Sequence, residues 1–146
     1  MQPLVTIVTT YYNRAGFLKE TLRSLQLQTM TDWEAIPWND GSTDNSEEIA
    51  REMAEMDSRF RIFGGERIGH AQSLVRSCAE AQGRYIGVLD SDDLLEPSAL
   101  EETAAVLESR PEIGMVYTDH VVIDGNGQRR GLGRRCQIPF SKDRML

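Results

Sequence analysis

The sequence predicts an α/β fold in which a mostly parallel sheet is flanked by helices. Short runs of apolar and β-branched residues alternate repeatedly with segments of helical periodicity along the 146 residues. Repeated strand–helix units place successive strands parallel to one another. Hydrophobic residues make up 40% of the chain and charged residues 27%, which is typical of a globular domain. We therefore expect residues 1–146 to form a single domain.

The predicted strands are short and rich in Val, Ile and aromatic residues, which favour extended structure. They are expected at residues 4–9, 33–38, 60–63, 85–89, 113–118 and 121–123. Pro37 has no amide N–H to donate, so we expect a local irregularity in the second strand. Residues 124–127 read Asp-Gly-Asn-Gly, a typical hairpin turn, and predict a short β-hairpin near the C-terminus.

Helices are predicted between these strands, because apolar residues recur there at intervals of three or four. The side chains expected to face inward are Leu18, Leu22 and Leu25, then Ile49, Met53 and Met56, then Ala71, Val75, Cys78 and Ala79, and finally Leu100, Ala104 and Leu107. Gly83 suits the end of the third helix and Pro97 the first turn of the fourth.

Charge and composition exclude several kinds of partner. The formal net charge of −7 argues against a nucleic acid, whose phosphates are bound by Lys and Arg. No apolar run approaches the roughly 20 residues of a transmembrane helix, and the N-terminus lacks the features of a signal peptide. Cys78 and Cys136 fit no metal spacing and are expected as reduced thiols. These features predict a cytoplasmic protein, which could lie peripherally at the inner face of the membrane.

Polar clusters follow three of the predicted strands. They are Thr10, Tyr12 and Asn13 after the first, Asp40, Gly41 and Ser42 after the second, and Asp90, Ser91, Asp92 and Asp93 after the strand at 85–89. In an open parallel sheet, ligands bind beyond the carboxyl ends of the strands. We therefore expect these clusters to meet at one edge and to form the functional site.

The acidic cluster at 90–93 predicts a metal site. Its three carboxylates repel one another by several kcal/mol per close pair, and a hard divalent cation relieves this repulsion. The alternative is that Asp92 or Asp93 caps the following helix and that the cluster is solvated. The position directly after an apolar strand favours the metal.

The segment that begins at Asp40 has two interpretations. Gly and Asp are common in turns, and Ser42 or Thr43 could simply cap a helix. In the functional interpretation, the ligand is a nucleotide: Asp40 accepts a hydrogen bond from an N–H of its nucleobase, and Gly41, which has no side chain, lets the ligand come close. Tyr12 could stack on the base, a contact worth about 1–3 kcal/mol, or could serve only in packing.

Together these motifs resemble family 2 of the glycosyltransferases, which has the Rossmann-like GT-A fold. The matching segments are Val5–Val8, Tyr12-Asn13, Ser24-Leu25, Gln28-Thr29, Asp40–Asp44, Gly83–Ile86, Asp90–Asp93 and Pro97. The resemblance spans roughly residues 4–123. It implies transfer of a sugar from a nucleoside diphosphate, with a UDP-sugar as the expected donor, usually with inversion at the anomeric carbon. The implied acceptor is a saccharide or a lipid-linked molecule.

The resemblance also implies roles for single residues. Tyr12 would stack on the base with Thr10 nearby, and Asp40 would hold the edge of the base. Asp90 would face the ribose and the metal, and Asp92 would bind the Mg²⁺ or Mn²⁺ that bridges the diphosphate, as in the family's DXD motif. The remaining predicted nucleotide-sugar-binding residues are Asn13, Gly41, Ser42 and Ser91.

The sequence departs from the family in three ways. Asn39 stands where an acid is common, and Leu74-Val75 stand where an Arg-Asn pair is common, so that Gln72 or Ser73 could supply polar contacts instead. The resemblance also implies a further portion with the acceptor site and the general base. We expect the chain to be truncated before that portion, which would leave apolar surface for a homodimer. The catalytic residues are therefore unassigned.

Two other functions fit the same residues. A non-catalytic nucleotide-binding module of this fold would bind the donor without hydrolysing or transferring it. A phosphatase with an aspartyl nucleophile would use Asp90 as the nucleophile and Asp92 as the acid. In such enzymes, however, the Asp-x-Asp motif normally follows an early strand, and here it comes late.

Overall fold

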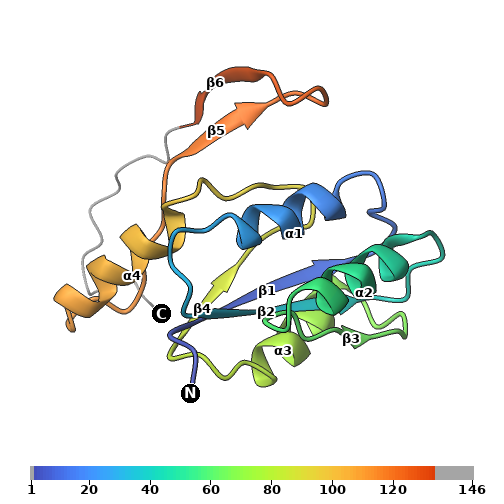
Figure 1. The fold of residues 1–146 in the computed structure, drawn as a ribbon, viewed down its shortest axis with the longest axis horizontal. Helices are drawn as coiled ribbons and strands as arrows, with labels where there is room; N and C mark the ends of the chain where they lie inside the picture. The colour runs from blue at the N-terminus through green and yellow to red at the C-terminus, as the bar shows by residue number, and fades with distance from the viewer. Residues whose placement is uncertain (1, 134–146) are drawn as a thin grey trace.

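The computed structural model describes residues 2–133 and contains a four-stranded parallel sheet flanked by helices (Figure 1). The strands are β1 (Val5–Tyr11), β2 (Trp33–Asn39), β3 (Phe63–Gly64) and β4 (Tyr85–Val88), in the order β3-β2-β1-β4. The helices are α1 (Leu18–Gln26), α2 (Ser46–Met56), α3 (His70–Ala79) and α4 (Ala99–Ser109). An antiparallel hairpin of β5 (His120–Ile123) and β6 (Arg129–Gly133) follows. The predicted α/β fold and its hairpin are confirmed.

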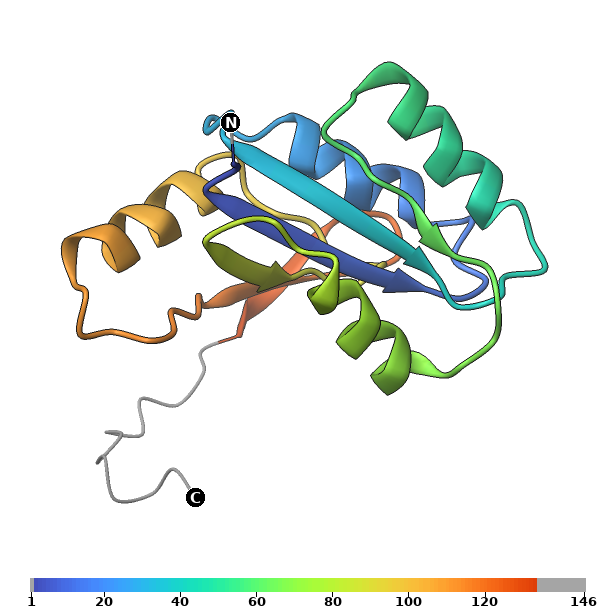
Figure 2. The ribbon, with the colours of Figure 1, turned by 90° about the horizontal axis from the view of Figure 1, so that it is seen from below.

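The two faces of the sheet differ in chemistry. Figure 2 shows α1 and α2 on one face and α3 on the other. The α1 face holds the main apolar core, in which the predicted residues Leu18, Leu22 and Leu25 are fully buried. On the opposite face α3 packs with a polar stripe, since its buried residues are Ser73 and Ser77.

The register of the parallel strands brings their carboxyl ends to one edge. Tyr11, the last residue of β1, lies beside Asn39, the last residue of β2, and β4 pairs with the other side of β1. The residues that follow these strands therefore emerge together. This is the edge at which the sequence predicts the site.

Pro37 interrupts the pairing between β2 and β3. Ala35 and Asn39 direct their backbone groups toward the β3 side, where Ala35 N–H donates to the Arg59 carbonyl and the Asn39 carbonyl accepts from Gly65 N–H. Pro37 lies two residues from each and so faces the same side, but it has no N–H to donate. The expected irregularity is therefore present, and β3 is only two residues long, beginning at Phe63 rather than at residue 60.

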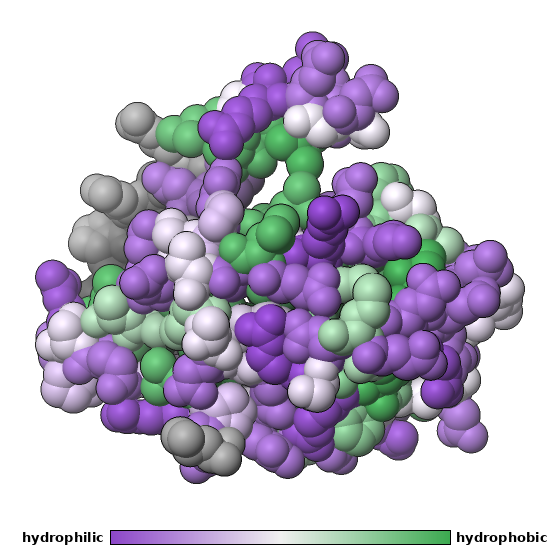
Figure 3. Space-filling model, viewed as in Figure 1, coloured by the Kyte–Doolittle hydropathy of each residue, from purple (hydrophilic) through white to green (hydrophobic). Residues whose placement is uncertain are grey.

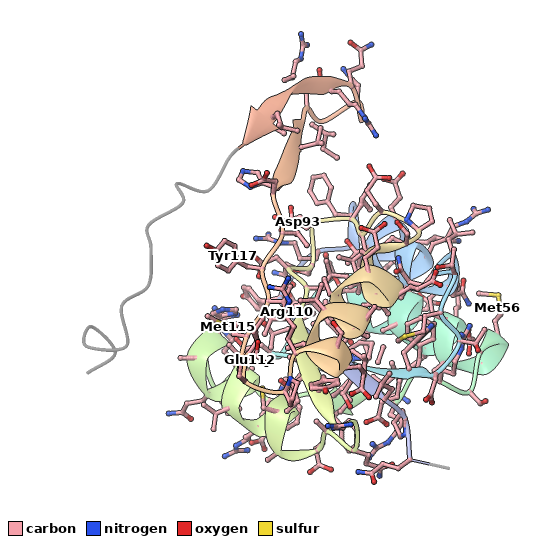
Figure 4. All side chains as sticks on the ribbon, turned by 90° about the vertical axis from the view of Figure 1, so that its left-hand side faces the viewer. Met56, Asp93, Arg110, Glu112, Met115 and Tyr117 are labelled. Carbon is pink, nitrogen blue, oxygen red and sulfur yellow. The ribbon has the colours of Figure 1, made fainter. Side chains whose placement is uncertain are left out.

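Several side chains that were expected to be buried are exposed. Met56 projects from α2 (Figure 4), with 67% of its surface exposed. Val75 on α3 is 70% exposed. Ala71 and Ala79 are exposed as well. For α3 the reason is that the helix turns its serines, and not its apolar residues, toward the sheet. The prediction that these four residues face inward is wrong.

The strand predicted as buried at residues 85–89 is an edge strand of the described sheet. Ile86 and Val88 are 49% and 59% exposed, because α3 lies over β1 and β2 rather than over β4. Residues 113–118, predicted as a strand, form none; no described strand lies beside them to supply backbone partners. In Figure 4, Glu112, Met115 and Tyr117 mark this segment, which leads from α4 to the hairpin.

The hairpin stands beside the body of the protein and presents apolar side chains. Val122, Ile123 and Leu132 are between 40% and 60% exposed, and Figure 3 shows apolar surface where the hairpin faces the body. A salt bridge of 3.0 Å between Arg129 and Glu96 links the hairpin to the loop before α4. None of the helices described is long and apolar enough to cross a membrane. Cys136 lies outside the described residues.

Gly83 tests how tightly β4 is joined to β1. Its N–H donates to the Thr6 hydroxyl, and an added Cβ would lie 2.5 Å from the Thr6 backbone nitrogen. Backbone atoms of a central strand cannot move aside, so Gly83→Ala should lower the free energy of unfolding by about 1–3 kcal/mol. Gly114→Ala is the control, since nothing lies within 4 Å of its added Cβ. Equal denaturation midpoints for the two variants in urea would contradict this packing.

Candidate functional site

An open cleft of about 410 Å³ lies at the edge where β1, β2 and β4 end. It is lined by Thr10, Tyr11, Tyr12, Arg14, Asp40, Arg67, His70, Asp90, Ser91 and Asp92. Six of the predicted site residues are therefore brought together, from three separate strand ends. Asn13, Gly41 and Ser42 lie next to these residues in the chain but do not line the cleft.

The carboxylate of Asp40 is buried at the base of the cleft, with 3% of the residue exposed. Its Oδ1 accepts hydrogen bonds from Ile68 N–H and Gly69 N–H, both at 2.8 Å, and from the Ser73 hydroxyl at 3.0 Å. Burial by itself raises the pKa of Asp40, but these hydrogen bonds and the charge of Arg67 outweigh it and hold the pKa below its ordinary value. Asp40 is therefore charged at neutral pH and fixes the loop before α3.

Arg67 lies across the two residues predicted to bind the base. Its Nη1 is 3.2 Å from Asp40 Oδ2, and its guanidinium carbon is 3.4 Å from the centre of the Tyr12 ring. The Tyr12 ring is partly exposed, so stacking on a ligand is sterically open once the guanidinium moves. Ser73, considered from the sequence as a ligand contact, instead donates to Asp40.

Asn13, Gly41 and Ser42 brace the walls of the cleft. Asn13, in a left-handed conformation with φ of 52°, accepts a hydrogen bond from Thr43 N–H at 2.8 Å and donates its own N–H to the Ser42 hydroxyl. At Gly41, where φ is 73°, an added Cβ would lie 2.7 Å from the backbone nitrogen of Arg67. The small size of Gly41 thus admits the Arg67 backbone.

Three residues that line the cleft were not among the predicted site residues: Arg14, Arg67 and His70. His70 Nδ1 is 2.9 Å from the Thr10 hydroxyl, which ties the start of α3 to the end of β1. Arg67 and His70 come from the loop and helix that follow β3. Because β3 is parallel to its neighbours, its following loop must reach the same edge. The strand order thus indicates that this loop reaches the edge, but not where its side chains lie.

The acidic loop, which carries residues 90–93, is held in place by hydrogen bonds from α1 and from Gln28, just after that helix. The Thr21 hydroxyl donates to the Ser91 carbonyl at 3.1 Å, and the Ser24 hydroxyl accepts from Leu95 N–H at 3.2 Å. The buried Gln28 donates to the Glu96 carbonyl at 2.9 Å and accepts from Leu100 N–H at 3.0 Å. These contacts explain the polar residues on an otherwise apolar helix face. They fix the backbone of the loop while Asp90 and Asp92 stay exposed.

The carboxylates at 90–93 are crowded, as the sequence predicts. Partial burial, followed by the negative charges of Asp90 and Asp92, raises the pKa of Asp93. Arg14 offsets part of this charge, with its Nε 3.8 Å from Asp92 Oδ2. Among residues 2–133, no group of three or more His, Cys, Asp or Glu side chains is placed to hold a metal ion.

A second hollow, of about 550 Å³, lies along the outer surface of α2. Its lining comes from that helix and the residues just before it: Asp44, Asn45, Glu47, Glu48, Arg51, Glu52 and Glu55. It is larger than the cleft but shallow, and no strand end opens into it. Its residues do not converge from different elements, so it is the weaker candidate.

Replacement of Asp40 tests its part in holding the cleft together. A carboxyl group whose pKa is lowered in the fold stabilises the protein above its unfolded pKa of about 3.9, and this stabilisation is lost as the pH falls through the folded pKa. Asp40→Asn should therefore reduce the free energy of unfolding at pH 7 by about 1–3 kcal/mol, and the difference from wild type should shrink below about pH 4. The measurement is urea denaturation at several pH values. The exposed Asp119→Asn is the control, and a gap that stays constant down to pH 3 would contradict this role.

The fold is similar to those of solved glycosyltransferase structures. TarS of S. aureus, solved as residues 1–349 in complex with UDP-GlcNAc, matches with a TM-score of 0.68 and 21% identity, over 73% of this chain and 32% of that one. The mannosyltransferase PcManGT from Pyrobaculum calidifontis, solved in complex with GDP-Man and Mn²⁺, matches with a TM-score of 0.62 and 26% identity, over 73% of this chain and 32% of that one. The chain thus has the GT-A fold.

Comparison with curated proteins and with family models gives the same result. The chain is 34% identical over 131 residues to the O-antigen biosynthesis protein RfbC of Myxococcus xanthus, covering 88% of this chain but 10% of that protein. It is 35% identical over 125 residues to the chondroitin synthase of Pasteurella multocida, covering 86% of this chain and 13% of that protein. The model of glycosyl transferase family 2 matches residues 6–145. The chain therefore belongs to family 2 of the glycosyltransferases.

Proposed function

We propose that the cleft binds the nucleotide part of a nucleotide-sugar donor, and that the protein transfers this sugar to an acceptor, with inversion. The observation that carries the proposal is the convergence of an aromatic face, a buried carboxylate and two exposed carboxylates in one cleft. These are Tyr12, Asp40, and the pair Asp90 and Asp92. The neighbours TarS, with UDP-GlcNAc, and PcManGT, with GDP-Man, bind ligands of this class.

The base is proposed to lie against Tyr12, with its edge toward Asp40. Tyr12 offers a ring face, and stacking of a base on such a face is worth about 1–3 kcal/mol. Asp40 Oδ1 is occupied by three donors from this chain, so a base N–H would be accepted by Oδ2. Thr10, Ser91 and Asp90 line the path from the base toward the ribose. Asn13, Gly41 and Ser42 would keep the two loops of the base subsite in place.

The residues at the acidic loop fit a divalent cation that arrives with the nucleotide. Mg²⁺ is usually bound by one or two carboxylates, together with waters and substrate phosphates, rather than by a complete protein cage. Asp90 and Asp92 supply two hard oxygen donors, and the remaining positions suit diphosphate oxygens. When bound, Mg²⁺ or Mn²⁺ would stabilise negative charge on the departing diphosphate. PcManGT was solved with Mn²⁺.

The chain's own groups would position the donor and balance its charge. Arg14 and Arg67 add positive charge to a cleft that also holds Asp40, Asp90 and Asp92. The general base that deprotonates the acceptor is not assigned among residues 2–133. The chain spans 10–15% of several of its longer curated relatives, and the activity of a whole protein of that kind is part of the proposal. The expected UDP-sugar donor, saccharide or lipid-linked acceptor, homodimer and cytoplasmic location remain predictions.

Family membership favours sugar transfer over the two alternatives. A non-catalytic module would bind UDP in the same way but would neither hydrolyse nor transfer the sugar of a UDP-sugar. A phosphatase with Asp90 as its nucleophile would release phosphate from an aryl phosphate, and this release would be lost in Asp90→Asn.

Metal-dependent binding of UDP is the direct test. Titration calorimetry should detect UDP binding with Mn²⁺ present and much weaker binding with a chelator. Asp92→Asn removes a proposed metal ligand, so it should weaken UDP binding in Mn²⁺ by roughly tenfold or more. Replacing a residue that only hydrogen-bonds to a metal ligand already costs about this much. The thermal midpoint should stay close to that of wild type, because the Asp92 side chain is 49% exposed.

Glu48→Gln is the matched control, since Glu48 belongs to the acidic hollow on α2. It should leave UDP affinity unchanged. Equal UDP affinity with Mn²⁺ and with chelator would overturn the metal part of the proposal. A loss of affinity in Glu48→Gln but not in Asp92→Asn would place the nucleotide site on α2.

A further inference from the structure

Arg67 already makes both contacts that are proposed for the base. Its guanidinium is a flat group that lies 3.4 Å from the centre of the Tyr12 ring. The same group is 3.2 Å from Asp40 Oδ2. A nucleobase bound as proposed would make the same two contacts, with its flat face on Tyr12 and an N–H directed at Asp40.

Asp40 Oδ2 depends on the Arg67 guanidinium for its partner. Oδ1 takes the donors from Ile68, Gly69 and Ser73, and among the described residues Arg67 is the partner of Oδ2. A buried carboxylate oxygen without a donor is costly. Any ligand that displaces the guanidinium must therefore bring a donor of its own.

The backbone of Arg67 is held in place at the cleft, but its side chain can move away from Tyr12 and Asp40. The Arg67 backbone lies against Gly41, close enough that a Cβ on Gly41 would be 2.7 Å from its nitrogen. The next two residues are held by Asp40. The side chain is 54% exposed, so it can rotate into solvent, and this rotation breaks its contacts with Tyr12 and Asp40.

We propose that Arg67 holds the nucleobase position until a nucleotide binds, and that the base then replaces the guanidinium on Tyr12 and at Asp40 Oδ2. This inference rests on the proposed function. It makes Arg67 a specificity-determining residue. A nucleobase with a flat face and an N–H on the edge toward Asp40 replaces both contacts of the guanidinium, the one with Tyr12 and the one with Asp40 Oδ2. A nucleobase without that N–H replaces only the contact with Tyr12.

Arg67→Met tests the replacement with uridine as the probe. Methionine keeps an unbranched side chain but loses both the charge and the donors. Calorimetry should give uridine binding about three- to thirtyfold tighter than in wild type, because an exposed cation–π contact and an exposed ion pair each contribute up to about fivefold. The gain should be smaller for 3-methyluridine, which lacks the N3–H donor for Oδ2.

Arg84→Met is the matched control. Arg84 is similarly exposed, lies 5.2 Å from the ring centre of Tyr85 and pairs with Glu108 at 2.9 Å, away from the cleft. Its replacement should leave uridine affinity unchanged. Unchanged or weaker uridine binding in Arg67→Met would overturn the inference, the weaker case meaning that Arg67 covers the second face of the base.

Nuclear magnetic resonance on the wild-type chain gives a second measurement, which does not depend on how the variant folds. The side-chain protons of Arg67 should be shifted upfield by the Tyr12 ring, and saturating uridine should remove the shift. A shift that persists at saturation would contradict displacement. If wild type and Arg67→Met bind neither uridine nor UDP with Mn²⁺, the proposed function itself fails. Binding of UDP with Mn²⁺ but no response to the Arg67 change rejects this inference alone.

Discussion

The buried carboxylate of Asp40 is the interaction on which the geometry of the cleft depends. It lies at the end of β2, yet its Oδ1 binds the backbone of residues 68 and 69 and the hydroxyl of Ser73 on α3. A buried charge without such partners would cost several kcal/mol, so the loop before α3 must come to this edge. This requirement also explains why Ser73 on α3 faces the sheet, since its hydroxyl donates to Asp40. The half of the cleft that is proposed to bind the base is therefore organised around one buried charge.

The acidic half of the cleft has a separate anchor. Thr21 and Ser24 on α1, and Gln28 just after it, form hydrogen bonds with the backbone of the loop that carries Asp90 and Asp92. Neither acid takes part in this anchoring, and both stay exposed. The backbone of the loop is thus fixed, while the carboxylates of Asp90 and Asp92 are exposed and take no part in holding it. That arrangement fits the proposed cation, because Mg²⁺ is usually bound by one or two carboxylates together with waters and substrate phosphates.

Local patterns predict the strands that flank the cleft and the position of its acids. The spacing of Leu18, Leu22 and Leu25 identifies the buried face of α1, and the apolar strand that precedes Asp90 indicates that this acid lies at the edge of the sheet where the cleft is found. The same reasoning failed for α3, because periodicity shows that a helix has an apolar face and not that this face is the packed one. Arg67 was missed for a different reason. Its place over Tyr12 depends on bonds to Asp40 from residues 28 and 29 positions further along the chain, and no local pattern encodes them.

Mapping where Mn²⁺ binds when UDP is present is the most direct test of this account. Mn²⁺ broadens the amide resonances of nearby residues, and two acidic regions compete for it: the loop at 90–93 and the hollow on α2. Broadening should be strongest at Asp90–Asp93, should extend to Tyr12, and should depend on UDP. Broadening centred on Glu48 and Glu52, or broadening at 90–93 that is the same without UDP, would contradict a cleft that binds metal and nucleotide together.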